Sequence, residues 1–145
     1  MNRRFTLAEA QTLIPEVSRL LQNALALKTS FVEAEQTMQD WNRRITIAGG
    51  MVVDRAAILE SRKRRDAFAT ALRSAIKQVQ STGCVVKDLD IGLIDFPTLF
   101  RGQEVYLCWK LGEPEIAFWH GTDEGFRGRK AIDQDFIDQH SGDPD

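Results

Sequence analysis

The chain has 145 residues, enough for one domain with a hydrophobic core, and 43% of them are hydrophobic, as in ordinary globular proteins. Its formal net charge of −2 predicts no general attraction to nucleic acid or to an anionic membrane surface. No apolar run approaches the roughly 18 residues that span a bilayer, and none follows the arginines near the N-terminus, so neither a membrane anchor nor a secretory signal is expected.

The first predicted element is a short helix. Thr6 and Glu9 have the spacing of a capping box, in which each side chain accepts a hydrogen bond from the other residue's amide. We expect this helix to end near Leu13, because Pro15 lacks the amide hydrogen that a helix interior needs. Pro15 suits the first turn of a helix, so a second helix is predicted over residues 15–44.

The second predicted helix carries apolar residues at alternating steps of three and four, the heptad spacing that keeps one seam toward a partner helix. The seam consists of Val17, Leu20, Ala24, Leu27, Phe31, Ala34, Met38 and Trp41. A break is expected at residues 48–50 (Ala-Gly-Gly), followed by a third helix over 54–80 with Asp54 as its N-cap and Gly83 beyond its end. The two long helices should fold back as an antiparallel hairpin.

One basic run, residues 62–65 (Arg-Lys-Arg-Arg), lies in the third predicted helix. It could form a patch for nucleic acid or phosphate, or it could pair with Glu33 and Glu35, which the hairpin brings close. Four consecutive helical residues point all around the axis and form no single stripe. With the acidic net charge, nucleic-acid binding is therefore not expected.

After residue 83 the pattern changes to short runs rich in β-branched and aromatic residues, separated by glycine and proline. Strands are predicted over residues 84–88, 91–96, 104–110 and 115–120, with Pro97 ending the second. The fold class is therefore α+β, with a long antiparallel helical hairpin and a short N-terminal helix packed on a three- to four-stranded antiparallel meander. Residues 1–132 are predicted to form one domain, and 133–145 an acidic, partly disordered tail with His140 in solvent.

The last predicted hairpin can be given a register. If Lys110 pairs with Glu115, then Val105 faces His120, and Cys108 lies on the opposite face of the sheet. Cys108 and His120 would then not share a metal. Both faces of this hairpin are partly apolar, so we expect the helices to cover one face and the C-terminal segment or a second subunit to cover part of the other.

Short motifs spread over nearly the whole chain resemble one protein family. They are Gly83-Cys84, residues 87–90, residues 92–97, Leu107-Cys108-Trp109, Gly112-Glu113, Trp119-His120 and residues 125–129, with Phe5-Thr6-Leu7 and Glu9-Ala10 near the N-terminus. Their order and spacing are similar to a family catalogued as domain of unknown function 2203. The resemblance implies a bacterial cytoplasmic protein, and it supplies no catalytic residues to carry over.

Candidate functional residues gather in the predicted sheet. His120 ends a strand, and an imidazole near carboxylates can bind a divalent cation or transfer protons. Cys84, Cys108 and His120 could supply ligands for zinc, although no pair has the close spacing of a zinc knuckle. Alternatively, His120 is a strand-end histidine that simply hydrogen-bonds a neighbouring carboxylate or carbonyl.

Asp95 lies within an apolar run, where a carboxylate needs a partner. Arg101, Arg127 or Arg129 could form a buried ion pair with it, or Arg127 and Arg129 could grip a phosphate or carboxylate. These alternatives stay open at this point. The candidate ligand or anion site therefore comprises Asp95, Glu113, His120, Arg127 and Arg129.

No Walker loop, dinucleotide fingerprint or serine-nucleophile elbow occurs in the sequence, which identifies no cofactor and no reaction. Two cysteines without an export signal are typical of reduced thiols in a cytoplasm. The seam from Val17 to Trp41 and the two-faced sheet predict a self-associating interaction module, a homodimer. The alternative is an enzyme or ligand-binding protein with a metal or anion site around His120.

Overall fold

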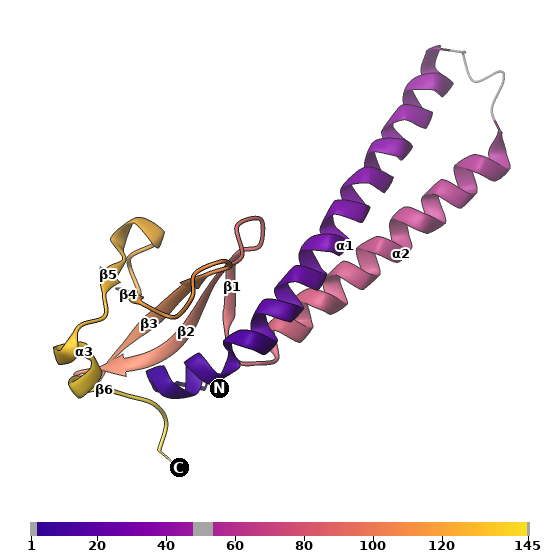
Figure 1. The fold of residues 1–145 in the computed structure, drawn as a ribbon. Helices are drawn as coiled ribbons and strands as arrows, with labels where there is room; N and C mark the ends of the chain where they lie inside the picture. Colours follow the sequence, from indigo (N-terminus) through magenta and orange to yellow (C-terminus); the bar gives the residue numbers. More distant parts are fainter. Residues whose placement is uncertain (1–2, 48–53, 145) are drawn as a thin grey trace. The chain divides into compact units, whose positions relative to one another are not determined.

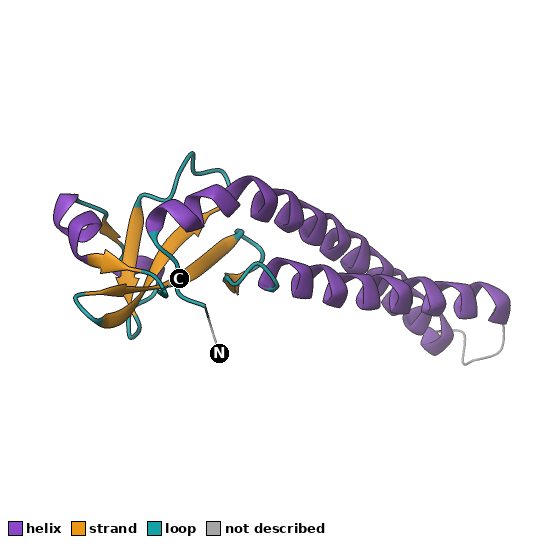
Figure 2. Ribbon diagram, turned by 90° about the horizontal axis from the view of Figure 1, so that it is seen from below, coloured by secondary structure: helices purple, strands orange, loops and turns teal. Residues whose placement is uncertain are grey.

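The computed structural model describes residues 3–47 and 54–144 as two long helices and a sheet-rich half (Figures 1 and 2). The break predicted at residues 48–50 lies outside the described residues, as does the last residue of the predicted tail. The chain divides into two compact units, which we call the sheet unit (Met1–Leu21 with Lys77–Asp145) and the hairpin unit (Gln22–Ile76). Among the described helices, none combines the length and apolar character needed to cross a membrane.

The first helix, α1 (Leu7–Ile47), is continuous, so the break predicted at Pro15 does not occur. The capping box is confirmed, because Thr6 Oγ1 accepts from Glu9 N at 3.1 Å and Glu9 Oε1 accepts from Thr6 N at 2.9 Å. Pro15 removes one hydrogen bond to the preceding turn. The neighbouring Ile14 and Val17 are buried in the core of the sheet unit, which offsets that loss, and α1 bends in its N-terminal part (Figure 1).

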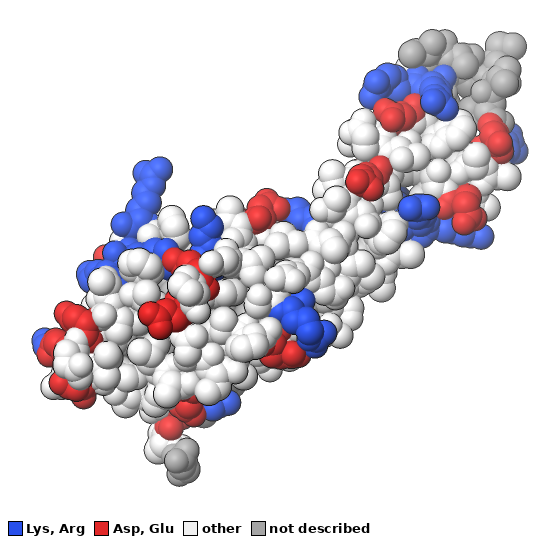
Figure 3. All heavy atoms as spheres, viewed as in Figure 1, with Lys and Arg blue, Asp and Glu red and all other residues white. Residues whose placement is uncertain are grey.

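The second helix, α2 (Arg55–Gln80), begins after Asp54, whose Oδ1 accepts from Ala57 N at 3.0 Å, so the predicted N-cap is confirmed. In the hairpin unit α1 and α2 run antiparallel, as expected (Figure 1). Arg65 Nε lies 3.8 Å from Glu35 Oε2, so the basic run does pair across the two helices at this position. Figure 3 shows acidic and basic side chains intermingled on this face of the hairpin.

The sheet unit contains one antiparallel sheet. Its strands are β1 (Val85–Asp88), β2 (Leu93–Phe100), β3 (Gln103–Lys110), β4 (Phe118–Gly121), β5 (Lys130–Ala131) and β6 (His140–Ser141). The order is β1-β2-β3-β4-β5, and β6 pairs with β2. A short 3-10 helix, η1 (Phe126–Gly128), precedes β5, and α3 (Gln134–Gln139) precedes β6. The predicted meander is thus present and is extended by β5 and β6.

Strand β2 continues through Pro97, which was expected to end it. The carbonyl oxygen of Pro97 accepts from Phe5 N at 2.7 Å, so the backbone polar groups of Pro97 face away from β3. On that side β1 pairs with β2 only as far as Asp95, and the pairing of β6 with β2 starts at Leu99. Pro97 therefore lies in a gap where its missing amide hydrogen breaks no ladder bond.

The two faces of the sheet differ, and we call them the core face and the outer face. The core face carries Ile94, Phe96, Leu107 and Trp109, which pack with the N-terminal part of α1 in one hydrophobic cluster. Side chains alternate along a strand, so the intervening residues Asp95 and Cys108 lie on the outer face. The candidate site is on this outer face.

The last described segment is also held by the sheet unit. Phe136 of α3 is buried and stacks on Trp119 and Phe100. His140 was expected in solvent, but it is half-buried and its Nε2 accepts from Leu7 N at 2.9 Å. The polar composition of residues 133–144 concealed these two anchors, whereas the domain limit at residue 132 stays a prediction.

Candidate functional site

Three buried polar side chains meet on the outer face of the sheet. Asp95 on β2, Cys108 on β3 and His120 on β4 have exposed fractions of 0%, 0% and 3%. Strand pairing places Asp95 opposite Cys108, and Cys108 opposite Phe118, two residues before His120. One potential ligand atom from each residue lies within 4.8 Å of the others. We call these residues the Asp95–Cys108–His120 cluster.

The register predicted for β3 and β4 was wrong by one residue. Tyr106 lies opposite His120, and Cys108 lies opposite Phe118. A slip of one residue moves every side chain of a strand to the other face. Cys108 and His120 therefore share a face, so the predicted opposite faces are wrong and no longer give a reason against a shared metal.

The cause of the slip is the turn after β3. Glu113 Oε1 accepts from Lys110 N at 2.7 Å, and Glu113 N donates to the carbonyl oxygen of Lys110 at 3.0 Å. These bonds close the turn locally, so Lys110 does not pair with Glu115. Strand β4 then begins only at Phe118.

His120 is fixed by hydrogen bonds at both ring nitrogens. Its Nε2 lies 3.0 Å from each carboxylate oxygen of Asp95, and its Nδ1 lies 2.8 Å from the carbonyl oxygen of Gly121. Because a carbonyl only accepts, Nδ1 carries a hydrogen. The interpretation of His120 as a strand-end histidine bonded to a carboxylate and a carbonyl thus describes its contacts correctly.

Asp95 has different partners from those predicted. The expected arginine partner is replaced by His120, and Lys87 Nζ lies 4.0 Å from Asp95 Oδ2. Lys87 was missing from the candidate set. Strand β1 pairs Val85 with Asp95, and its register with β2 shifts between Val86 and Asp88, so Lys87 lies at an irregularity of the strand from which its ammonium reaches Asp95. The turn between β1 and β2 was the sequence signal that could have placed Lys87 there.

Arg129 and Glu113 form a second, separate pair. Arg129 Nη2 lies 2.6 Å from Glu113 Oε1, and its guanidinium carbon lies 4.1 Å and 4.8 Å from the ring centroids of Phe118 and Phe126. Arg127 is exposed and makes no ion pair with any residue that the structure describes. The five candidates are therefore two pairs and one separate residue.

This arrangement limits what the site can do chemically. The Arg129 charge is balanced by Glu113, so these contacts tie the loop before β5 to the sheet and do not favour an anion pocket, which stays a prediction. Neither of two surface hollows, one lined by Arg3 and residues 80–85 and the other in the hairpin unit, involves the five candidates. The closed Asp95–Cys108–His120 cluster suits a proton or a small cation better than an organic ligand.

We expect both cysteines to be unreactive in the folded protein. Burial, with a smaller effect of the Asp95 charge, raises the pKa of Cys108 to about 12, and burial also raises the pKa of Cys84. At about pH 8 the Cys108 thiol therefore stays protonated, and the thiolate that reacts is scarce. DTNB should therefore label neither thiol within minutes, but both at once in denaturant. Equal labelling rates in the two conditions would contradict this prediction.

Comparison with curated proteins and with solved structures finds no match. A family model described as "Uncharacterized conserved protein (DUF2203)" matches residues 3–132. The matched span contains α1, α2, the strands β1 to β5 and the whole Asp95–Cys108–His120 cluster. It covers most of the chain, and the chain therefore belongs to the DUF2203 family of uncharacterised conserved proteins.

Proposed function

We propose that this protein works by association and that its hairpin unit pairs with that of a second copy to form a homodimer. The observation that carries the proposal is that the hairpin unit buries few large apolar side chains. Among its described residues, the buried apolar side chains are Ala24, Ala34, Met38 and Ala75. Three of these four are alanines, so the two helices bury little apolar surface between them.

The larger seam residues are left only partly covered. Leu27, Phe31 and Trp41 on α1, and Phe68 and Leu72 on α2, are half-buried. In a four-helix bundle, residues at such positions form the interior. A second hairpin brings the same heptad spacing and would bury the same side chains in both copies, as a two-fold interface requires.

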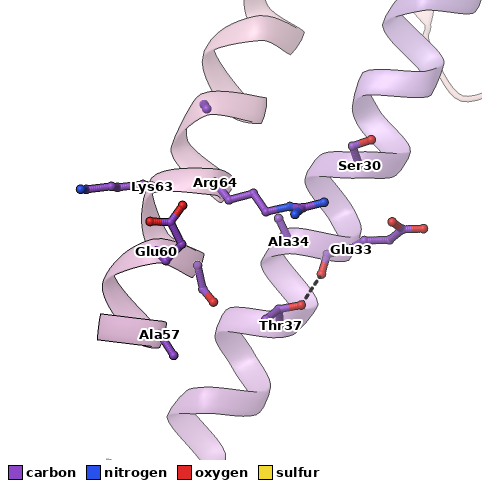
Figure 4. Close-up of a pocket in the computed structure, with 10 residues that line it drawn as sticks. Ser30, Glu33, Ala34, Thr37, Ala57, Glu60, Lys63 and Arg64 are labelled. Atoms are coloured by element: carbon purple, nitrogen blue, oxygen red, sulfur yellow. Dashed lines mark hydrogen bonds between the residues drawn. The ribbon is translucent and has the colours of Figure 1, made fainter. Parts of the chain in front are cut away.

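The charges along the groove between α1 and α2 also favour association with a second copy. A groove of about 760 Å³ lies between α1 and α2 (Figure 4). Its lining includes Glu33 and Glu60 together with Lys63 and Arg64. Arg64 reaches across toward α1, whereas Lys63 points away from the groove (Figure 4). A patch that holds both signs can pair with itself across a two-fold axis, because each acid can meet a base of the other copy.

The proposed compartment is the cytoplasm. Cys84 and Cys108 are both free and buried, and neither has a disulfide partner among the described residues. Free thiols are typical of proteins kept in a reducing compartment.

The association can be tested by sedimentation velocity from low to high micromolar concentration. We expect a dimer that dissociates on dilution. Replacing Phe31 with glutamine should weaken the dimer by about tenfold or more, because truncating a buried aromatic contact removes a dominant part of an interface.

The neighbouring Val32 provides the matched control, since it is 54% exposed and lies on another side of α1. Val32→Gln should leave the dimer unchanged, and circular dichroism should show both variants helical. A wild-type chain that stays monomeric at high micromolar concentration would refute the proposal, whatever the variants do.

A further inference from the structure

We propose that Asp95, Cys108 and His120 bind one divalent transition-metal ion of the zinc class within the sheet. The three side chains come from three adjacent strands and are all at least nine-tenths buried. Their potential ligand atoms lie within 4.8 Å of one another. Such a site would exist in each copy whether or not the hairpin units associate.

The hydrogen bond of His120 to Gly121 is an independent reason for this inference. Nδ1 donates to the Gly121 carbonyl at 2.8 Å, so a neutral ring presents its lone pair at Nε2. That nitrogen lies 3.0 Å from both oxygens of Asp95. A lone pair cannot face a carboxylate without a positive charge between them, so either a proton or a metal ion must lie there.

The surroundings of His120 also suit a metal ion. Metal-binding histidines usually donate their second ring N–H to a backbone carbonyl or a carboxylate, as His120 does to Gly121. With metal–ligand bonds of about 2.0–2.3 Å in a tetrahedron, neighbouring ligand atoms lie about 3.3–3.6 Å apart. The 3.0 Å separation of Nε2 and the Asp95 oxygens is somewhat shorter than this value, and the three ligand atoms, which lie within 4.8 Å of one another, would have to adjust around the ion.

The donor set indicates the class of metal. One imidazole nitrogen, one carboxylate oxygen and one thiolate sulfur suit zinc or cobalt, whereas calcium and magnesium prefer oxygen ligands alone. Three protein ligands leave a fourth position for water or an exogenous ligand. Because Asp95 and Cys108 bind as anions, a divalent ion leaves the site electrically neutral, which limits the cost of burying it.

Lys87 is the group that competes with the metal. Its Nζ lies 4.0 Å from Asp95 Oδ2, and its side chain is 44% exposed. A half-exposed lysine can turn its ammonium into solvent while its stem stays on the protein surface. Lys87 can therefore give up its contact with Asp95 when a metal ion binds.

The experiment is a cobalt titration of the chelator-treated full-length protein. We expect one equivalent of Co²⁺ per chain to produce a thiolate-to-cobalt charge-transfer band, and Zn²⁺ to remove that band by displacement. Cys108→Ser should abolish the band. His120→Gln should weaken metal binding by about 100-fold or more, since loss of a ligand exceeds the cost of losing an outer hydrogen bond.

Cys84→Ser is the matched control. Cys84 is also buried, but it lies outside the cluster. Its sulfur accepts a hydrogen bond from the Thr82 hydroxyl and donates one to the Val79 carbonyl. This variant should keep the band, and circular dichroism should show that each variant is folded. The proposal is overturned if the folded wild type gives no band and no thermal shift with Zn²⁺. It is also overturned if the band survives Cys108→Ser or disappears in a folded Cys84→Ser variant.

Discussion

Replacing His120 with leucine should lower the free energy of unfolding by about 3–5 kcal/mol in chelator-treated protein, because it leaves a buried carboxylate without its partner. The Asp95 side chain has no exposed surface, and His120 contacts both of its oxygens. The remaining cation, Lys87, lies 4.0 Å away and is half in solvent, so it can compensate only weakly. This is the largest effect that we expect from a single side chain in the sheet.

Asp95→Asn should be much milder, costing about 1 kcal/mol or less. The hydrogen on Nδ1 leaves Nε2 as an acceptor, and the introduced amide can donate to it. The pair would then become a neutral hydrogen bond of similar shape. The two substitutions therefore separate the loss of a partner from the loss of a charge.

Urea unfolding at about pH 8 measures the loss of stability in both variants. At this pH the histidines of the unfolded chain are neutral, so their protonation does not contribute to the difference. The prediction fails if His120→Leu costs no more than about 1 kcal/mol, which would mean that the Asp95 carboxylate is uncharged or hydrated. If Asp95→Asn costs as much as His120→Leu, then the ring needs a charged partner and is held as an imidazolium.

The helices were predictable from the sequence because their limits depend on local chemistry. The capping box of Thr6 and Glu9 and the N-cap Asp54 form the hydrogen bonds that their sequence spacing predicts. Pro15 was the exception. Its local preference favours a helix start, but the burial of Ile14 and Val17 in the core of the sheet unit keeps the helix continuous. Tertiary packing therefore overrode a local signal there.

The site was predictable only in part: Asp95 and His120 were among its predicted members, whereas the place of Cys108 beside them, the contact of Lys87 and the pairing were not predicted. The sequence showed that Asp95 and His120 each needed a polar partner, yet 25 positions separate them. Only the register across β2, β3 and β4 brings them together. Between β3 and β4 the register goes with a local turn, in which the Glu113 side chain accepts from the Lys110 amide and the Glu113 amide donates to the Lys110 carbonyl. A hydrogen bond of this kind leaves no periodic signal, so the face of Cys108 was assigned wrongly.

Gly83→Ala should lower the free energy of unfolding by about 2–5 kcal/mol in total. Gly83 follows α2 with a φ of +104°, a conformation that costs a residue with a β-carbon about 1–2 kcal/mol. A β-carbon there would also lie 2.5 Å from Phe5 Cζ. Phe5 is fully buried and packs edge-on against Phe96, so the ring has no room to withdraw, and overpacking adds about 1–3 kcal/mol.

Gly112→Ala is the matched control, because Gly112 has a nearly identical φ of +101° and open space where a β-carbon would lie. It should show the backbone cost alone, about 1–2 kcal/mol. The difference between the two urea midpoints therefore measures the contact with Phe5. Equal losses would show that the Phe5 ring moves freely, and that the N-terminal segment is not fixed against the end of α2 as the packing of Phe5 requires.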